Sequence, residues 1–334
     1  MITKALLCIF PLKSDHYLLC WRHAYSHAYS QAQSNEHAQV NMLSRITVSI
    51  VTYNSASVIA GCLESIPAHV PVMICDNRST DNTLVVAKAV RPDVMIHRAH
   101  KNLGFGRAHN VNLKKAKTEF CLILNPDTRF LPGCFDALLS AADRFPEAAI
   151  IGAQHYEDDG VTPVVSIGND PYCHIVLDRA PHNTRHAKKW PESVCCVEFI
   201  IGALMLFRMD AFTKTGFFDP RIFMYHEDVE ICARLRKAGH SVLFEPLAKV
   251  VHLAGKSSGS SHFVTRLKQF YHSECKLIVF GKYHGGRVEM ARFATKEFTT
   301  QLRRLLKAAF RLDVSGMHKH AAGIMGVLSG MNKV

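Results

Sequence analysis

The sequence Ile46-Thr47-Val48-Ser49-Ile50-Val51 is an apolar run of strand length, and it breaks into the polar residues Thr52-Tyr53-Asn54. Similar polar clusters follow downstream at Asp76-Asn77, at the turn Asn102-Leu103-Gly104-Phe105-Gly106, and at Asn125-Pro126-Asp127. Each follows an apolar run and precedes or interrupts a helical pattern. The carboxyl ends of parallel strands lie along one edge of an open α/β sheet. We therefore expect these polar clusters to converge on one crevice.

The order of the predicted elements indicates an α/β fold, in which the first four strand-to-helix units form a doubly wound half-domain. Strands are predicted at Ile46–Val51, Val70–Cys75, Val94–His97, Phe120–Leu124, Ala149–Ala153, Ser241–Glu245 and Val250–His252, and Val197–Arg208 is an ordered apolar stretch of unassigned type. Helices are predicted from Ser55 or Ser57 onward, and over Asn82–Val90, Phe105–Lys115, Cys134–Arg144, Val229–Ala238, Ser261–Phe280 and Arg287–Leu312. Residues 155–195 show no pattern that we can assign.

The chain divides into three regions by composition. Residues 1–44 carry a tandem His-Ala-Tyr-Ser followed by a polar stretch, which predicts a disordered or mis-annotated extension, with Met42 as an alternative start. Residues 45–258 contain the alternating strands and helices and are expected to form the domain that carries the functional site. Residues 259–334 are expected to form a basic helical region.

Bulk composition narrows the partners and the compartment. The formal charge of +12 favours an anionic partner, such as a phosphorylated substrate or a phospholipid surface. Aromatic residues are not interleaved with the basic ones, so we expect no nucleic-acid partner. The eleven cysteines are scattered without a C-x-x-C motif, which favours free thiols in a reducing cytosol. No apolar run reaches the roughly 18 residues of a membrane span, so a cytoplasmic location is expected.

Two of the polar clusters suggest chemistry. Asp76 follows a strand and could accept the N3 proton of a uracil or thymine ring, or it could form an ordinary Asx turn. Asn125 and Asp127 place an amide oxygen and a carboxylate two residues apart, which suits Mg²⁺ or Mn²⁺ completed by a diphosphate. The alternative for this second cluster is a type I turn with proline at its second position.

Gly104 and Gly106 form part of the dinucleotide motif G-x-G-x-x-G, but His109 stands where the third glycine would be. The first strand-to-helix crossing contains no glycine at all. We therefore do not expect NAD binding.

A third cluster, Glu227-Asp228, precedes a predicted helix. A carboxylate at a helix N-terminus is favoured in its ionised form, which suits a base that takes a proton from an acceptor hydroxyl. The alternative is that these acids only complement the helix dipole and that Arg234 is a surface residue. His252, on a short strand, could be a metal ligand or a core histidine.

Together and in this order, the motifs resemble the inverting family 2 glycosyltransferases of GT-A fold, most closely a bacterial rhamnosyltransferase-like branch. The resemblance runs from Ile46 to about Ser258, nearly two thirds of the chain. It is carried by Val51-Thr52-Tyr53-Asn54, Asp76-Asn77-x-Ser79-x-Asp81-x-Thr83, Asn102-x-Gly104-Phe105-Gly106-x-Ala108-x-Asn110, Asn125-Pro126-Asp127, Gly202-Ala203 and the block from Phe223 to Arg234.

The resemblance implies a role for each matching position. The nucleotide sugar would be bound by Thr52, Tyr53, Asn54, Asp76, Asn77, Arg107, Asn110 and Asn125. The Mg²⁺ or Mn²⁺ ion would be held by Asp127, with Asn125 in place of the first aspartate of the D-x-D element, and by His252. Asp228 would be the catalytic base, beside Glu227, and the acceptor side would include Gly202, Ala203 and Arg234.

The implied activity is transfer of a sugar to a cell-surface polysaccharide or a lipid-linked glycan, and the branch suggests rhamnose from dTDP-rhamnose. Two alternatives stay open from the residues. One is a family 2 transferase that uses a UDP-hexose or a UDP-N-acetylhexosamine. The other is a non-catalytic protein that only binds a nucleotide sugar.

The C-terminal region adds a possible membrane partner. Residues 281–334 hold ten Lys or Arg against three Asp or Glu. In the helix predicted over residues 287–312, Phe298, Leu302, Leu305, Ala309 and Leu312 lie on one side, and Lys296, Arg303, Lys307 and Arg311 lie opposite. Such a helix either lies on an anionic membrane, at the inner face of the plasma membrane, or packs on the catalytic domain with a solvated basic face.

Overall fold

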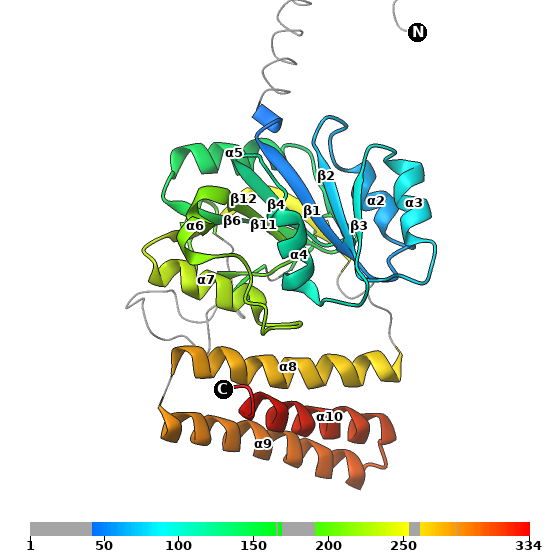
Figure 1. The fold of residues 1–334 in the computed structure, drawn as a ribbon, viewed down its shortest axis with the longest axis vertical. Coiled ribbons are helices and arrows are strands. Elements are labelled where there is room, and N and C mark those ends of the chain that lie inside the picture. The colour runs from blue at the N-terminus through cyan, green and yellow to red at the C-terminus, as the bar shows by residue number, and fades with distance from the viewer. Residues whose placement is uncertain (1–41, 165, 169–190, 254–260, 285) are drawn as a thin grey trace, which may run out of the picture. The chain divides into compact units, whose positions relative to one another are not determined.

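The structure is a computed structural model that describes residues 42–164, 166–168, 191–253, 261–284 and 286–334. Residues 45–334 form one compact unit (Figure 1). Of the predicted extension 1–44, only Met42–Ser44 lies within the described residues. The predicted boundary at residue 258 falls in the gap 254–260, which is outside them.

Among the described residues, ten strands form one mixed sheet, in which eight follow the order β3-β2-β1-β4-β11-β6-β12-β5. Strands β7 and β9 pair with β6 and β12. The bounds are β1 (Ile46–Thr52), β2 (Val72–Asp76), β3 (Met95–Arg98), β4 (Phe120–Leu124), β5 (Thr128–Phe130), β6 (Ala148–Tyr156), β7 (Pro163–Val164), β9 (Cys195–Cys196), β11 (Leu204–Arg208) and β12 (Ser241–His252). A small second sheet pairs β8 (Ile167–Gly168) with β10 (Phe199–Ile200).

Strands β3, β2, β1 and β4 are parallel, and β11 is antiparallel to β4. The carboxyl ends of β1, β2 and β4 therefore lie along one edge, as predicted. Every residue of β4 is buried, which agrees with its all-apolar sequence.

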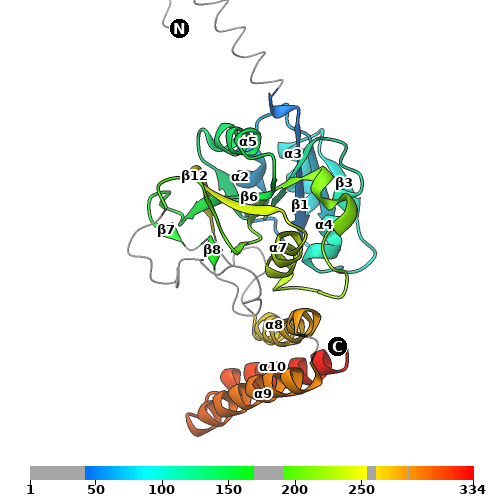
Figure 2. The ribbon, with the colours of Figure 1, turned by 90° about the vertical axis from the view of Figure 1, so that its left-hand side faces the viewer.

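Helices cover both faces of the sheet, with α2 and α4 on opposite sides of β1 (Figure 2). The described helices before β12 are α2 (Ile59–Glu64), α3 (Thr83–Val90), α4 (Phe105–Leu113), α5 (Cys134–Arg144), the 3-10 turn η2 (Met209–Ala211), α6 (Phe212–Thr215) and α7 (Glu227–Lys237). Three further helices follow, α8 (His262–Tyr283), α9 (Arg287–Phe310) and α10 (Val314–Met331). In both views they lie together on one side of the sheet domain.

Strand β12 corrects one prediction. Its two halves, predicted as separate strands, form one strand with a register shift against β6 between Glu245 and Lys249. Pro246 lies within this irregularity. A β-bulge tolerates a residue that cannot donate to the ladder, so the sequence break is a bulge rather than a turn.

Helix α10 was not predicted, because its sequence contains glycines that disfavour a helix. In the structure Gly323, Gly326 and Gly330 are buried. A Cβ atom at Gly326 would lie 2.2 Å from the carbonyl oxygen of Phe270 in α8, and one at Gly330 would lie 2.8 Å from that of Glu274. The glycines therefore allow α10 to approach α8 closely, which compensates for their low helix propensity.

Part of the side of α9 that was predicted to be apolar packs against the neighbouring helices. Phe298 packs against the cluster of Leu277, Ala294 and Val327, so this side of α9 helps to hold the three helices together. Among the residues that the structure describes, none of the helices has the length and apolar character that a membrane span needs. The eight cysteines among these residues are free, and six of them are buried, as predicted.

Candidate active site

The first part of the site is the pair Thr52 and Asp76, at the ends of β1 and β2. They are register partners, and Thr52 Oγ1 donates to Asp76 Oδ1 at 2.9 Å. The buried Asp76 carboxylate also accepts hydrogen bonds from the backbone N–H and the hydroxyl of Ser79. Asp76 therefore orders the loop after β2, and its contact with a base stays a prediction. Tyr53, directly after β1, is 42% exposed.

Asn54 joins the loop after β1 to the loop after β2. Its side-chain oxygen accepts from the backbone N–H of Thr80 at 2.8 Å, and its own N–H donates to Ser79 Oγ at 2.9 Å. Ser55 N–H donates to Thr83 Oγ1 at 2.7 Å in the same region. Asn54 therefore supports the shape of the predicted nucleotide-binding edge.

Asn77 links this edge to the glycine-containing turn. Its Nδ2 donates to the carbonyl of Gly104 at 2.9 Å, and its Oδ1 accepts from Leu103 N–H at 3.0 Å. Gly104 has φ of 82°, and a Cβ atom there would lie 2.0 Å from the carbonyl oxygen of Phe223. Only glycine fits this position. Phe105 N–H donates to the same Phe223 oxygen at 3.0 Å, so the turn touches the loop that precedes Asp228.

The two predicted donor-side residues of α4 have different surroundings. Asn110 uses both ends of its amide on the backbone of Phe218, at 2.8 and 3.0 Å, and so holds the segment before the catalytic loop. The guanidinium of Arg107 lies 5.5 Å from the centre of the Phe223 ring. Arg107 therefore places a cation beside the loop that leads to Asp228.

Asn125, Asp127 and His252 come together at the ends of β4 and β12. His252 Nε2 lies 3.5 Å from Asp127 Oδ1 and 3.4 Å from Asn125 Nδ2. Strand β5 brings them together, because Thr128 is the register partner of His252. The structure thus places the two predicted metal ligands side by side, although they are 125 residues apart in the sequence.

This arrangement fits a divalent cation. A buried carboxylate and an imidazole are ligand types that Mn²⁺ accepts, and Mg²⁺ favours the oxygen. Within the described ranges no group of three or more acidic, histidine or cysteine side chains could hold a metal ion.

His155 of β6 was missed by the sequence reading. Its ring centre lies 5.6 Å from that of His252, and it is buried. Burial lowers the pKa of His155 to about 3, so its ring is neutral at physiological pH. A single histidine at the end of an apolar strand is typical of a core residue, so the sequence held no signal for it.

Asp228 and Glu227 lie in the first turn of α7 but differ in environment. Asp228 is half-buried, and its carboxylate accepts from the backbone N–H groups of Gly202, at 3.1 Å, and Val229, at 2.9 Å. Glu227 is 8% exposed, and burial, with a smaller contribution from the charge of Asp228, raises the pKa of Glu227 to about 8. Burial therefore favours the protonated form of Glu227, which leaves the half-buried Asp228 as the candidate base.

Gly202 and Ala203 connect the metal side of the edge to the catalytic side. The carbonyl of Ala203 accepts from Asn125 N–H at 3.0 Å, while Gly202 N–H donates to Asp228. In the structure these two residues lie between Asn125 and Asp228, and their role on the acceptor side stays a prediction.

The guanidinium of Arg234, predicted to lie on the acceptor side, is engaged within the protein. All five of its N–H donors are used within the protein, on the Glu230 carboxylate and on the carbonyls of Thr215, Gly216 and Phe217. Its guanidinium therefore has no donor left for an acceptor sugar, and it holds the 215–217 turn against α7.

Residues 47–215 match the sequence profile described as glycosyl transferase family 2. The chain belongs to this family. A comparison with curated proteins agrees. This chain is similar to the N-acetylglucosaminyl-diphospho-decaprenol L-rhamnosyltransferase of Mycobacterium tuberculosis (strain H37Rv), with 33% identity over 228 residues. The alignment covers 60% of this chain and 73% of that protein. Rhamnosyltransferase WbbL of Escherichia coli (strain K12) is 33% identical over 73 residues, 22% of this chain and 28% of that one.

Solved structures confirm the GT-A fold of this family 2 glycosyltransferase. The mannosyltransferase PcManGT from Pyrobaculum calidifontis, in complex with GDP-Man and Mn²⁺, has a TM-score of 0.50 at 15% identity and covers 86% of this chain and 87% of its own. GalNAc-T7 with UDP, GalNAc and Mn²⁺ has a TM-score of 0.50 at 17% identity over 70% of this chain. The present chain spans only half of that structure. Both likenesses concern the fold alone.

In this family 2 glycosyltransferase, helix α8 lies beyond the matched residues and contacts the segment before Asp228. Phe223 stacks on Tyr271 with ring centres 4.2 Å apart, and the His226 ring lies 4.7 Å from that of His272. Tyr225 and His226 have φ values of 70° and 66°, a conformation that costs energy in non-glycine residues. The α8 contacts hold this strained turn directly in front of Asp228.

Two polar side chains at the end of α8 form hydrogen bonds with residues on either side of the same turn. Lys282 Nζ donates to Asp219 Oδ2 at 2.9 Å and to Glu230 Oε1 at 2.5 Å. The Tyr283 hydroxyl donates to the Glu230 carbonyl at 3.1 Å. These α8 residues were not identified from the sequence, because nothing in a lysine and a tyrosine on an amphipathic helix points to a catalytic loop elsewhere.

Proposed function

We propose that this glycosyltransferase moves L-rhamnose from dTDP-rhamnose to a lipid-linked glycan, with inversion at the anomeric carbon. The relative of 33% identity is named for rhamnosyl transfer to a diphospho-decaprenol acceptor, which supports the same classes of donor and acceptor. The observation that carries the catalytic part is the link through Gly202 and Ala203 between Asn125, next to the predicted metal ligands, and Asp228.

In this reaction Asp228 is the general base. Its carboxylate takes the proton from the acceptor hydroxyl as that oxygen attacks the anomeric carbon, and the bond from this carbon to the diphosphate breaks on the opposite side. No covalent intermediate forms, so no nucleophilic side chain is needed. Glu227, in which burial favours the protonated form, does not compete for the proton and adds no second charge near the acceptor.

The nucleotide sugar would be held at the end of the sheet edge away from Asp228. Tyr53 offers an exposed ring to the base, and Asp76 and Asn77 hold the loops around it. Arg107 supplies a positive charge toward the diphosphate. Asp127 and His252 would hold Mg²⁺ or Mn²⁺, and such an ion neutralises the charge that develops on the leaving nucleotide.

We also propose that the protein works in the cytoplasm at the inner face of the plasma membrane, with residues 45–258 as the catalytic domain and 259–334 as the basic helical region. A lipid-linked acceptor requires the enzyme to reach a bilayer. The basic composition of residues 281–334 supports this location.

A panel of donors tests the proposed function. The purified full chain is incubated with a polyprenyl-diphosphate-linked N-acetylglucosamine and with dTDP-rhamnose, UDP-glucose or UDP-N-acetylglucosamine, and nucleotide release and glycolipid product are measured. Acceptor-dependent release of dTDP, with a product of inverted anomeric configuration, is expected. Turnover with a UDP-sugar alone would reject rhamnose, and binding without turnover for every donor would favour a non-catalytic role.

A further inference from the structure

One side of α9 is exposed over most of its length, with Thr299 half-buried in its middle, and it is not the apolar side that the sequence predicted. Residues spaced at helical intervals form this outer face: Val288, Arg292, Lys296, Arg303, Leu306, Lys307 and Phe310. All of them are exposed, with Phe310 at 92%, while Phe298 of the predicted apolar side packs against the cluster that contains Val327 of α10. The outer face thus combines four cations with three large apolar side chains.

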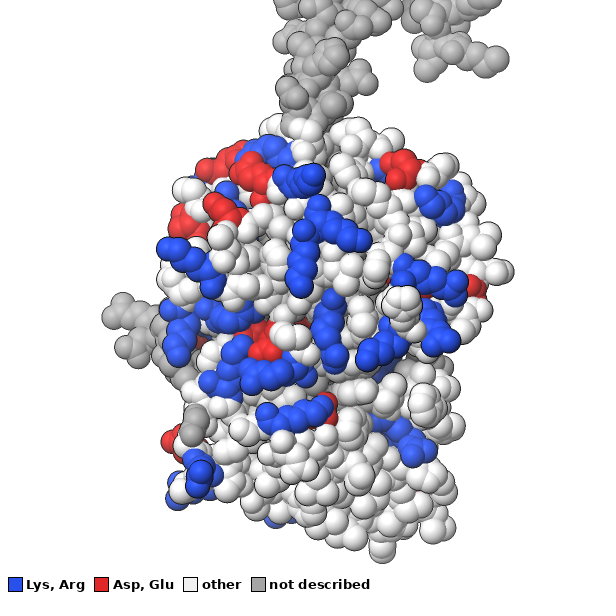
Figure 3. Space-filling model, viewed as in Figure 1, with Lys and Arg blue, Asp and Glu red and all other residues white. Residues whose placement is uncertain are grey.

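The apolar character continues into the α9–α10 turn. Leu312 and Val314 are 85% and 58% exposed, directly beside Phe310. A soluble surface rarely gathers large apolar side chains in this way unless they meet a partner. On the side of the molecule shown in Figure 3, the three C-terminal helices carry few charged residues compared with the sheet domain.

The cations of the outer face are not engaged by acidic groups. Within the described part of the chain, no ion pair includes Arg292, Lys296, Arg303 or Lys307. Of the nearby acids, Glu297 is bound to Lys276 of α8 at 2.6 Å, and Asp313 caps α10 through Gly316 N–H at 2.9 Å. The face is therefore open to anionic groups from outside the protein.

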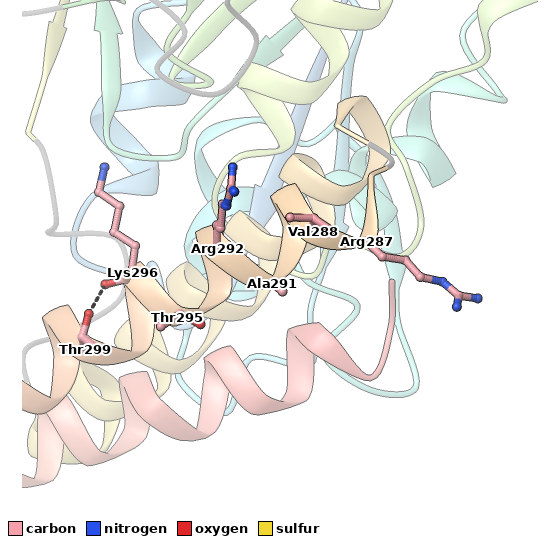
Figure 4. Close-up of a pocket in the computed structure, with 7 residues that line it drawn as sticks. All are labelled: Arg287, Val288, Ala291, Arg292, Thr295, Lys296 and Thr299. Atoms are coloured by element: carbon pink, nitrogen blue, oxygen red, sulfur yellow. Dashed lines mark hydrogen bonds between the residues drawn. The ribbon is translucent and has the colours of Figure 1, made fainter.

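The N-terminal half of the face carries a shallow, open depression of about 710 Å³. Its lining includes Val288, Arg292, Thr295, Lys296 and Thr299. Figure 4 shows Arg292 and Lys296 extending from the same side of α9, with Val288 close to them. Two cations, hydroxyl groups and an apolar side chain in one hollow suit a phosphate group attached to a hydrocarbon chain.

We propose that the outer face of α9 and the α9–α10 turn dock onto an anionic lipid bilayer, and this inference rests on the proposed lipid-linked acceptor. Arg292, Lys296, Arg303 and Lys307 bind lipid phosphates, and Leu306, Phe310 and Leu312 insert among the acyl chains. A second copy of the chain fits less well, because pairing two such faces would bring together eight cations, which outnumber the two exposed Glu289 carboxylates of the same helices.

Co-sedimentation of the full chain with vesicles tests this surface. Vesicles of phosphatidylcholine with phosphatidylglycerol should retain the protein at low salt, and high salt or pure phosphatidylcholine should release most of it. The variant Leu306→Ser/Phe310→Ser and the variant Arg303→Gln/Lys307→Gln should each lose about tenfold or more in affinity for anionic vesicles. The control Val85→Ser/Leu247→Ser removes two apolar side chains that are 69% and 66% exposed on the catalytic part, and it should bind like the wild type.

Equal vesicle binding by all three variants, or no binding by the wild type, would overturn the proposal. So would concentration-dependent dimers in light scattering that both α9 variants abolish while vesicle binding persists. Binding of dTDP, measured by calorimetry without vesicles, should be unchanged in the α9 variants. Failure of the wild type to bind dTDP would reject the proposed function and leave the vesicle result standing, so the two failures are distinguishable.

Discussion

The backbone N–H of Gly202 donates a hydrogen bond to Asp228 Oδ2 at 3.1 Å. Gly202 precedes β11, and Asp228 lies in the first turn of α7, so this bond fixes the carboxylate against the sheet edge. The neighbouring residue, Ala203, binds Asn125. The position of the proposed base is therefore tied directly to the strand end that carries Asp127.

Replacement of Asp228 by asparagine keeps the size of the side chain and an oxygen that can accept from Gly202, but it removes the base. We expect kcat to fall by about 10²- to 10⁴-fold, with the affinity for the donor nucleotide nearly unchanged. Steady-state turnover and calorimetric titration with dTDP measure the two quantities. An unchanged kcat would remove Asp228 from the mechanism.

Glu227 makes the stability of the protein depend on pH. Its folded pKa, about 8, lies above the ordinary value of 4.5. The folded state therefore binds the proton more tightly, and this stabilisation is complete below pH 4.5 and is lost as the pH rises toward 8. The slope in this window is at most about 1.4 kcal/mol per pH unit.

The variant Glu227→Gln should show less loss of stability between pH 5 and 8, roughly, than the wild type, in urea denaturation at several pH values. Glu157→Gln, an exposed position, serves as the control and should behave like the wild type. Parallel pH curves for the wild type and Glu227→Gln would show that Glu227 is ionised in the folded protein.

Removal of His252 should weaken the binding of a divalent cation. The variant His252→Ala loses the imidazole 3.5 Å from Asp127, and we expect the apparent Kd for Mn²⁺ in the presence of dTDP to rise on the order of tenfold to a hundredfold. Electron paramagnetic resonance of free Mn²⁺ measures this directly. His97→Ala, in β3, is the matched control, and equal Kd values for both variants would contradict the assignment.

Lys282 should stabilise the catalytic loop from α8. Its ammonium group is 25% exposed and binds two carboxylates, of which Glu230 is fully buried. Lys282→Met should lower the free energy of unfolding by about 1–3 kcal/mol, and it should lower kcat more than it changes the KM for the donor. Lys237→Met, an exposed lysine on α7, should have neither effect.

A methyl group at Gly326 should separate α10 from α8. Its Cβ would lie 2.2 Å from the Phe270 carbonyl, and backbone cannot move aside without cost. Gly326→Ala should therefore lower the free energy of unfolding by about 1–3 kcal/mol, as measured by denaturant titration. Gly286→Ala, which would meet only the flexible Glu289 side chain, should be close to neutral.

Local patterns were sufficient to predict the first half of the fold. The strands before Thr52, Asp76 and Asn125 end at one edge because parallel strands require it, and the predicted positions of α5 and β4 agree with the structure. The second half depends on contacts between distant segments. Helix α10 is stabilised by close contact with α8, which no helix propensity reports, and β12 continues through a bulge that resembles a chain break.

The sequence was sufficient to predict which residues lie at the site, but not what each side chain contacts there. Asp127 and His252 meet as expected, yet Arg234 and Asn110 turned out to bind backbone groups of the protein itself. A polar side chain in a motif can serve the ligand or the loop beside it, and only the three-dimensional structure separates the two. Tyr271 and Lys282 could not be found, since their partners lie about 50 residues away in the sequence.

The central claim is that Asp76, Asp127 and Asp228 surround one nucleotide-sugar pocket. A crystal structure of the full chain with dTDP and Mn²⁺ tests it most directly. The account predicts the base beside Tyr53 and Asp76, the metal ion on Asp127 and His252, and the terminal phosphate facing Asp228. Nucleotide bound away from this edge, with Asp127 and Asp228 not contacting the same pocket, would contradict it.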